Sequence, residues 1–179
     1  MKNERLAAKR RTGRELALQL LCQMDLNQAQ DAGEGAGVFW GMMDAPDGED
    51  ITEAMAACAR RESMRRFAAE MAAGAWESRR ELDAEISAHV RNWSLRRLGT
   101  VERNVLRLGA WELKNRPGVP RGTIVNEAID MAKYFSSVRS GRFVNGVLDK
   151  VADKWRPRDA AADGAAARKP AAAEEGADA

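Results

Sequence analysis

An all-α fold is predicted by three features of this 179-residue chain. Apolar residues recur every three or four positions through most of the sequence, which is the spacing of one helix face. No segment alternates apolar and polar residues as a half-buried strand does. Breaks such as Pro117-Gly118 divide the apolar runs into lengths typical of globular helices. Because 45% of the residues are hydrophobic, the chain can bury one sizeable core.

The first two helical regions are predicted from their apolar stripes. Residues 14–26 place Ala17, Leu20, Leu21 and Met24 on one face, so the first helix is expected there. Residues 51–91 carry a second long series of apolar residues at helical spacing. We expect two helices in this region, with a break at residues 78–80.

A central helix is predicted after Thr100, which is its expected N-cap. From Val101 to Leu113 the helix is apolar nearly all round, which is typical of a buried helix. The next helix is expected to begin at about Pro120 or Thr123 and to end at Phe135.

The last helix is expected to be capped by Ser140 and to end before Pro157. Its interior contains Asn145-Gly146, a pair common in hairpin turns, but the flanking residues do not alternate as strands do. A glycine inside a helix costs about 1 kcal/mol relative to alanine. We therefore expect Gly146 to mark the close approach of another backbone or of a ligand.

Two acidic stretches differ from the helical regions. Residues 27–53 hold seven acids and no Lys or Arg, and residues 159–179 hold five acids, two cations and eleven alanines. Such stretches bury too little apolar surface to offset the entropy of ordering, although an apolar group of Phe39, Trp40, Met42 and Met43 is expected to dock on the core. The expected organisation is a helical domain over residues 1–158, with a partly flexible acidic insert at 27–53, and a disordered Ala-rich tail at 159–179.

The sequence contains no motif typical of an enzyme or of a cofactor site. The chain has one histidine, His89, and two cysteines, Cys22 and Cys58, without C-x-x-C spacing, so neither a zinc site nor a disulfide framework is expected. No GxGxxG or GxxxxGK[ST] phosphate loop occurs. The chain also lacks an apolar run of the roughly 20 residues that a membrane helix needs, and a secretory signal. We expect a cytoplasmic binding protein without cofactor, metal or catalytic residues.

Basic residues are concentrated near the N-terminus. Residues 1–14 hold six cations against one acid, Glu4. Outside the two acidic stretches the chain is strongly basic, although its net charge is only +2. This distribution is compatible with a polyanionic partner and equally with a solvated surface that the acidic segments balance. Arg10, Arg11 and Arg14 are expected at the start of the first helix, where positive charge opposes the helix dipole. A bound phosphate would explain such a cluster.

Four sequence blocks resemble the NusB family of transcription antitermination factors. The most specific are residues 123–133, TIVNEAIDMAK, and residues 142–150, RFVNGVLDK. Residues 9–15, KRRTGRE, are similar to the arginine-rich N-terminal block of the family, and residues 101–108, VERNVLRL, to its central helix. The resemblance covers roughly residues 9–26 and 63–156, whereas residues 27–62 are longer and more acidic than is usual in the family.

The resemblance implies an all-α, NusB-like fold of about seven helices in two packed subdomains. It also implies binding to boxA-type single-stranded RNA in ribosomal RNA leader transcripts, together with NusE, a small-subunit ribosomal protein. The complex would help the RNA polymerase elongation complex read through terminators, and homodimer formation by the free protein is left open. The alternatives are an RNA-binding accessory module of the kind fused to ribosomal RNA cytosine-5 methyltransferases, and a non-catalytic helical scaffold.

Site residues follow from the basic cluster and from the resemblance. Phe143 would stack on an unpaired base, as aromatic side chains do on single-stranded RNA, unless it only packs in the core. Glu102 and Arg103 are expected to face the protein partner, with a dipole-stabilising first-turn carboxylate as the alternative for Glu102. The residues expected to bind RNA are Lys9, Arg10, Arg11, Arg14, Arg139, Arg142 and Phe143.

Overall fold

The computed structural model describes residues 2–44, 61–90 and 95–157. Within these ranges the chain forms seven α-helices and a short 3-10 helix, and no strand, which confirms the predicted all-α class. The elements are α1 (Lys2–Leu26), α2 (Ala32–Asp44), α4 (Glu62–Glu77), α5 (Arg79–His89), η1 (Leu95–Arg97), α6 (Thr100–Asn115), α7 (Arg121–Phe135) and α8 (Val138–Trp155). None of the described helices is long and apolar enough to cross a membrane.

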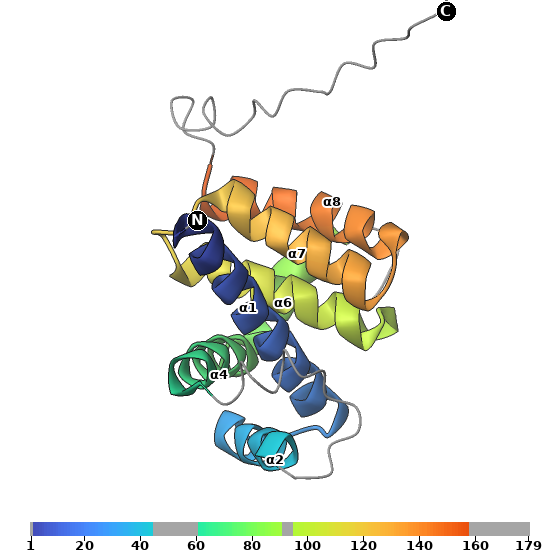
Figure 1. Cartoon of the computed structure of the whole chain (residues 1–179). Coiled ribbons are helices and arrows are strands. Elements are labelled where there is room, and N and C mark those ends of the chain that lie inside the picture. The colour runs from blue at the N-terminus through green and yellow to red at the C-terminus, as the bar shows by residue number, and fades with distance from the viewer. Residues whose placement is uncertain (1, 45–60, 91–94, 158–179) are drawn as a thin grey trace, which may run out of the picture.

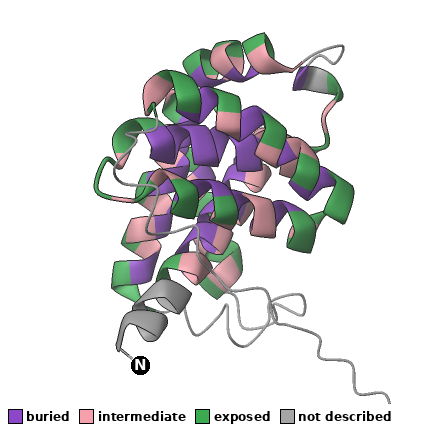
Figure 2. Cartoon of the chain, turned by 90° about the horizontal axis from the view of Figure 1, so that it is seen from above, coloured by how far each residue is buried: buried purple, intermediate pink, exposed green. Residues whose placement is uncertain are grey.

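The helices form two groups that meet at α1 and α6 (Figure 1). α6, α7 and α8 pack side by side, and α5 lies against α6 and α8. α1 contacts α6 and also packs against α2 and α4, which form the second group. Figure 2 shows the buried residues on the facing sides of the helices and the exposed ones on the outer sides. Two packed helical subdomains are therefore present, as the resemblance implied.

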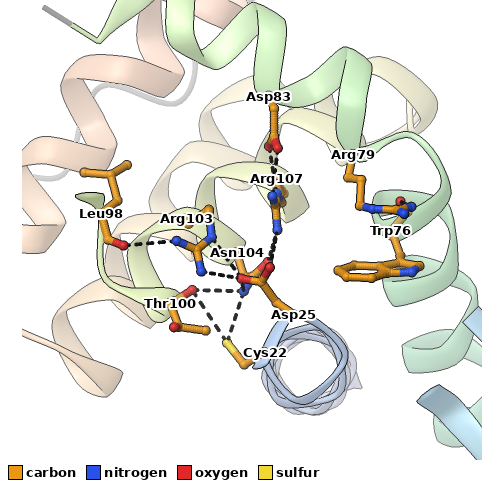
Figure 3. Close-up of polar contacts among 10 residues, drawn as sticks. All are labelled: Cys22, Asp25, Trp76, Arg79, Asp83, Leu98, Thr100, Arg103, Asn104 and Arg107. Atoms are coloured by element: carbon orange, nitrogen blue, oxygen red, sulfur yellow. Dashed lines mark hydrogen bonds and ion pairs between the residues drawn. The ribbon is translucent and has the colours of Figure 1, made fainter. Parts of the chain in front are cut away.

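α6 is the central helix of the fold. Residues 104–113 of this helix are buried without interruption, which confirms the prediction from its apolar surface. The polar members of this run are paired with other helices. Arg107 donates to both carboxylate oxygens of Asp83 in α5 at 2.7 Å and to Asp25 in α1 at 3.1 Å, as Figure 3 shows. The same carboxylate of Asp25 accepts from Asn104 at 2.9 Å. A polar network therefore fixes α1 and α5 on α6.

Several predicted boundaries are wrong. α1 begins at Lys2 rather than near residue 14, so Arg10 and Arg14 lie about two to three turns inside the helix. Gly99, not Thr100, is the N-cap residue of α6. The N-cap of α8 is Ser137, whose hydroxyl accepts from the backbone N–H of Ser140 at 3.1 Å.

The acidic insert is partly helical. The structure places Ala32–Asp44, within the segment expected to be loosely ordered, in α2. Phe39 is buried and contacts Trp40 edge to face, and Trp40 and Met43 pack against the core, so these three residues dock as expected. The expectation is wrong for Met42, which is 61% exposed. Residues 45–53, the predicted helical residues 51–60 and the tail at 159–179 lie outside the described residues.

Two arginines, Arg121 at the start of α7 and Arg156 after α8, connect the α6–α7 loop to the C-terminal end of α8. Arg156, the residue after α8, donates to the carbonyl oxygens of Pro117 at 3.1 Å and Val119 at 2.8 Å. Arg121 donates in the opposite direction, to the carbonyl oxygen of Arg156 at 3.2 Å and to that of Asp149 at 3.2 Å. The far end of α8 is thereby anchored, and its N-terminal end carries the residues described next.

Candidate nucleic-acid interface

Arg139, Arg142 and Phe143 lie in the first two turns of α8. Both arginine residues are exposed, and Phe143 is half-buried, with part of its ring packed on the core. Phe143 and Arg139 line a surface pocket of about 490 Å³ between the start of α8 and the η1–α6 junction, where Arg97 and Glu102 form part of the opposite wall. Both interpretations of Phe143 are thus compatible with its position, because the ring contacts the core and also borders an open pocket.

Glu102 ties the start of α6 to the α7–α8 turn. Its Oε1 atom accepts hydrogen bonds from the hydroxyls of Ser136 and Ser140, both at 2.6 Å. Burial alone would raise the pKa of Glu102, but these two hydrogen bonds and one from its own backbone N–H hold the pKa below its ordinary value. The carboxylate is therefore ionised and fixed at the wall of the pocket that Phe143 and Arg139 share.

Arg103, the other residue expected at a protein partner, is engaged within the chain. Its guanidinium donates to Asp25 Oδ2 at 2.6 and 2.9 Å and to the carbonyl oxygen of Leu98 at 3.1 Å (Figure 3). The side chain is only 17% exposed. This position favours a role in fixing α1 on α6 over direct contact with a partner.

The basic cluster of α1 is divided between the surface and the interior. Arg10 is exposed, and Arg11 is 41% exposed and pairs with Glu15 at 3.2 Å and Asp130 at 3.6 Å. The side chain of Lys9 lies outside the described residues. Arg14, in contrast, is 3% exposed and binds Glu112 through two hydrogen bonds. A buried guanidinium in this geometry is not free for a phosphate, so the expected RNA contact does not fit the position of Arg14.

Lys133 of α7 lies between the α1 and α8 residues, and the sequence interpretation missed it. Its stem packs over Gly141 of α8, where a Cβ atom would lie 2.6 Å from Cγ of Lys133. Its ammonium group is 3.9 Å from Asp130, the same carboxylate that Arg11 approaches. Lys133 belongs to the family-like block at 123–133, but only the α7–α8 packing shows that it lies over Gly141, the residue before Arg142. We call Arg10, Arg11, Lys133, Arg139, Arg142 and Phe143 the basic surface.

The described residues contain no group of three or more His, Cys, Asp or Glu that could hold a metal ion. Burial raises the pKa of Cys22 to about 11, so this thiol is protonated at neutral pH. His89 pairs with Glu85 on its own helix at 3.0 Å.

Comparison with known proteins places this helical chain among the transcription antitermination proteins. It is 41% identical over 143 residues to the transcription antitermination protein NusB of Myxococcus xanthus, an alignment that covers 80% of this chain and 94% of the relative. The NusB of Sorangium cellulosum is also 41% identical, over 145 residues and 91% of its length. The family model described as the NusB family matches residues 11–153. The chain belongs to the NusB family.

Solved structures share the fold. NusB of T. maritima superposes with a TM-score of 0.65 at 29% sequence identity, over 81% of this chain and 91% of that chain. A structure of the antitermination factors NusB and NusE in complex with double-stranded RNA contains a chain that matches with a TM-score of 0.65 at 26% identity, over 82% of this chain and 98% of that chain. The similarity therefore extends over nearly the full length of both solved chains.

Proposed function

We propose that this protein is a transcription antitermination factor that binds boxA-type RNA in ribosomal RNA leader transcripts together with NusE, in the cytoplasm. The complex helps the RNA polymerase elongation complex read through terminators. The observation that carries the proposal is the family match over residues 11–153, joined to the likeness to a chain from a structure of NusB and NusE with RNA. The role is one of binding, with no catalytic step assigned to any residue.

The basic surface is proposed to hold the RNA. Its exposed cations, with Lys9 of the same N-terminal cluster, contact phosphates, which supply sequence-independent affinity. Phe143 offers its free face to an unstacked base, the usual way in which single-stranded RNA is recognised. Arg14 is omitted from the proposed contacts because Glu112 occupies its guanidinium.

The protein partner is proposed to bind beside the RNA, over Glu102. Because Glu102 shares a pocket with Arg139 and Phe143, a partner that covers its carboxylate also borders the base-stacking position. A cation of the partner can pair with the ionised carboxylate. Arg103 supports this site indirectly, through the bond to Asp25 that holds the start of α6.

The test is RNA binding by the full chain with and without NusE, on a boxA RNA and on a scrambled RNA of the same length. We expect tighter binding to boxA than to scrambled RNA, and a further gain with NusE. Equal affinity for both RNAs would contradict the proposal and return the protein to the scaffold alternative. Copurification with a ribosomal RNA methyltransferase, rather than with transcription factors, would support the accessory-module alternative.

A further inference from the structure

The basic surface contains two groups of cations, one in the first two turns of α8 and one in α1, and a residue of α7 links them. This residue is Lys133, whose stem packs over Gly141, the residue before Arg142. Its ammonium group lies 3.9 Å from the carboxylate of Asp130, which Arg11 approaches at 3.6 Å. An RNA strand that contacts both groups therefore passes over the C-terminal half of α7.

Along α8, in contrast, the basic surface does not continue past Phe143. The sequence predicted that Gly146 marks the close approach of another backbone or of a ligand. A Cβ atom built on Gly146 would meet no atom of the described chain within 4 Å, so the approach of another backbone is not found among the described residues. Asp149 and Asp153 follow on the same side of the helix at i+3 and i+7, and Asp153 is 62% exposed. With Lys150 as their neighbour, these acids leave this stretch without an excess of positive charge.

Tyr134, the residue after Lys133, is 74% exposed. Every other aromatic side chain of the described residues is buried or partly buried. The ring of Tyr134 meets Phe135 edge to face, with the ring centroids 4.8 Å apart, and its high exposure leaves ring surface open to solvent. A single exposed apolar residue is ordinary at a protein surface. An open aromatic ring among cations, however, is the arrangement that holds single-stranded nucleic acid.

Two acids share the side of α7 that carries Tyr134. Asp130 lies at i−4 and Glu127 at i−7 from the tyrosine. The carboxylate of Asp130 lies between Arg11 and Lys133, and these two cations balance its charge. Glu127 is half-buried, and its burial raises the pKa of its carboxyl above the ordinary value. Stacking needs an open ring face rather than an excess of positive charge, so both acids are compatible with a base on Tyr134.

We propose that Tyr134 is a second base-stacking residue, on which a base of the RNA lies where the strand crosses α7 between the two groups of cations. This inference rests on the proposed function and extends it, because Phe143 is then one of two stacking positions. The neighbouring Lys133 supplies a phosphate contact, so a ring and a cation act on the same stretch of the strand.

The direct test observes Tyr134 itself. It is the single tyrosine of the chain, so the full-length protein labelled with fluorotyrosine gives one fluorine NMR signal. We expect boxA RNA, added at saturating NusE, to move this signal, because a stacked base changes the surroundings of the ring. NusE added without RNA should leave the signal in place.

Affinities of variants provide the second test. Tyr134→Ala should lower the affinity for boxA RNA by about fivefold or more, as expected for the loss of one stacked base. Tyr134→Phe keeps the ring and should bind as the wild type does. Because Tyr134 is exposed, the melting temperature of Tyr134→Ala should shift by no more than about 2 °C. Met42→Ala is the matched control, since Met42 is a 61% exposed apolar residue of α2, which packs on α1 and α4. It should leave RNA affinity unchanged.

Unchanged boxA affinity of Tyr134→Ala would overturn the inference, while a wild-type preference for boxA would still support the proposed function. An equal loss of affinity in Tyr134→Phe would also overturn it, because the hydroxyl rather than the ring would then make the contact. The same holds for a fluorine signal that moves with NusE alone and no further with RNA, since a protein would then cover Tyr134. Equal wild-type affinity for boxA and scrambled RNA would instead be the failure of the proposed function, and the inference would fail with it.

Discussion

Arg14 of α1 and Glu112 of α6 form a two-bond ion pair inside the protein. Nε of Arg14 donates to Oε2 of Glu112 at 2.7 Å, and Nη2 donates to Oε1 at 2.8 Å, although the residues are 98 positions apart in the sequence. Their side chains are 3% and 4% exposed. Glu112 outweighs the effect of burial and raises the pKa of Arg14, so the guanidinium stays charged. The pair therefore fixes the crossing of α1 over α6.

Loss of this pair should destabilise the fold. Arg14→Leu leaves the Glu112 carboxylate buried without its cation, and we expect a loss of about 3–5 kcal/mol in the free energy of unfolding, measured by urea denaturation. The double variant Arg14→Leu/Glu112→Leu should recover part of this loss. Arg10→Leu, at an exposed position of the same helix, should change stability by no more than about 0.5 kcal/mol. Equal effects of Arg14→Leu and Arg10→Leu would contradict the structural role of Arg14.

The exposed cations should determine how RNA binding depends on salt. Each phosphate contact removed from single-stranded RNA lowers the slope of log K against log salt concentration by about 0.7. We expect this decrease for Arg10→Ala, for Arg11→Ala and for Lys133→Ala, measured by titration between 50 and 200 mM salt. The control is Arg66→Ala, since Arg66 is exposed in α4 beside Glu62. Three unchanged slopes would remove these residues from the RNA contact.

Phe143 allows packing and stacking to be separated. Phe143→Leu keeps an apolar side chain but removes the flat aromatic face, so boxA affinity should fall by about 1–3 kcal/mol if a base stacks there. The stability cost of this apolar substitution should stay at roughly 1 kcal/mol. Binding to scrambled RNA at the same salt concentration is the control, because phosphate contacts dominate it. Equal boxA affinity of variant and wild type would assign Phe143 to the core alone.

Asp25 should make stability depend on acid pH. Burial favours the neutral carboxyl, but hydrogen bonds from Arg103 and Asn104 and the charge of Arg107 outweigh it and lower the pKa of Asp25. A carboxyl with a lowered folded-state pKa contributes stability above its unfolded pKa, near 3.9, and this contribution disappears as the pH falls through the folded value.

Asp25→Asn should therefore be less stable than wild type at pH 7, and the difference should shrink as the pH falls below about 4. Unfolding free energies measured between pH 2 and pH 7 test this expectation. Glu62→Gln, at an exposed position of α4, is the control and should follow the wild-type curve. A difference that is constant with pH would contradict the assignment of the acid sensitivity to Asp25.

The helices that were predicted correctly are those with a clear apolar pattern in their own sequence. α6 is apolar over most of its surface, and α8 places Val144, Val147, Leu148 and Val151 on one face, so local periodicity was sufficient. The first turns of α1 lack such an apolar stripe. Apolar periodicity therefore could not predict that the helix begins at Lys2. α2 was missed because its glycines lower helix propensity, whereas docking of Phe39 on the core supports the helix.

The sequence identified the types of residue that form the candidate site. It could not show which of these side chains are accessible to a ligand. Arg11 and Arg14 are equivalent members of one cluster in the sequence, yet one is 41% exposed and the other 3%. The difference comes from Glu112, whose approach depends on the packing of α1 on α6. Lys133 was missed for the same reason, since its proximity to Gly141 arises only when α7 and α8 pack. Long-range packing therefore decides which charges can reach a ligand.

The tie between Arg156 and the α6–α7 loop bears on where the chain can be shortened. Arg156 holds the carbonyl oxygens of Pro117 and Val119, and its own carbonyl oxygen accepts from Arg121. A truncation after Trp155 would keep every residue of α8 but remove the hydrogen bonds that Arg156 makes with the α6–α7 loop and with Arg121. We expect the last turn of α8 to fray in such a variant. The minimal folding unit at this end therefore includes Arg156, one residue beyond the point at which the helix itself stops.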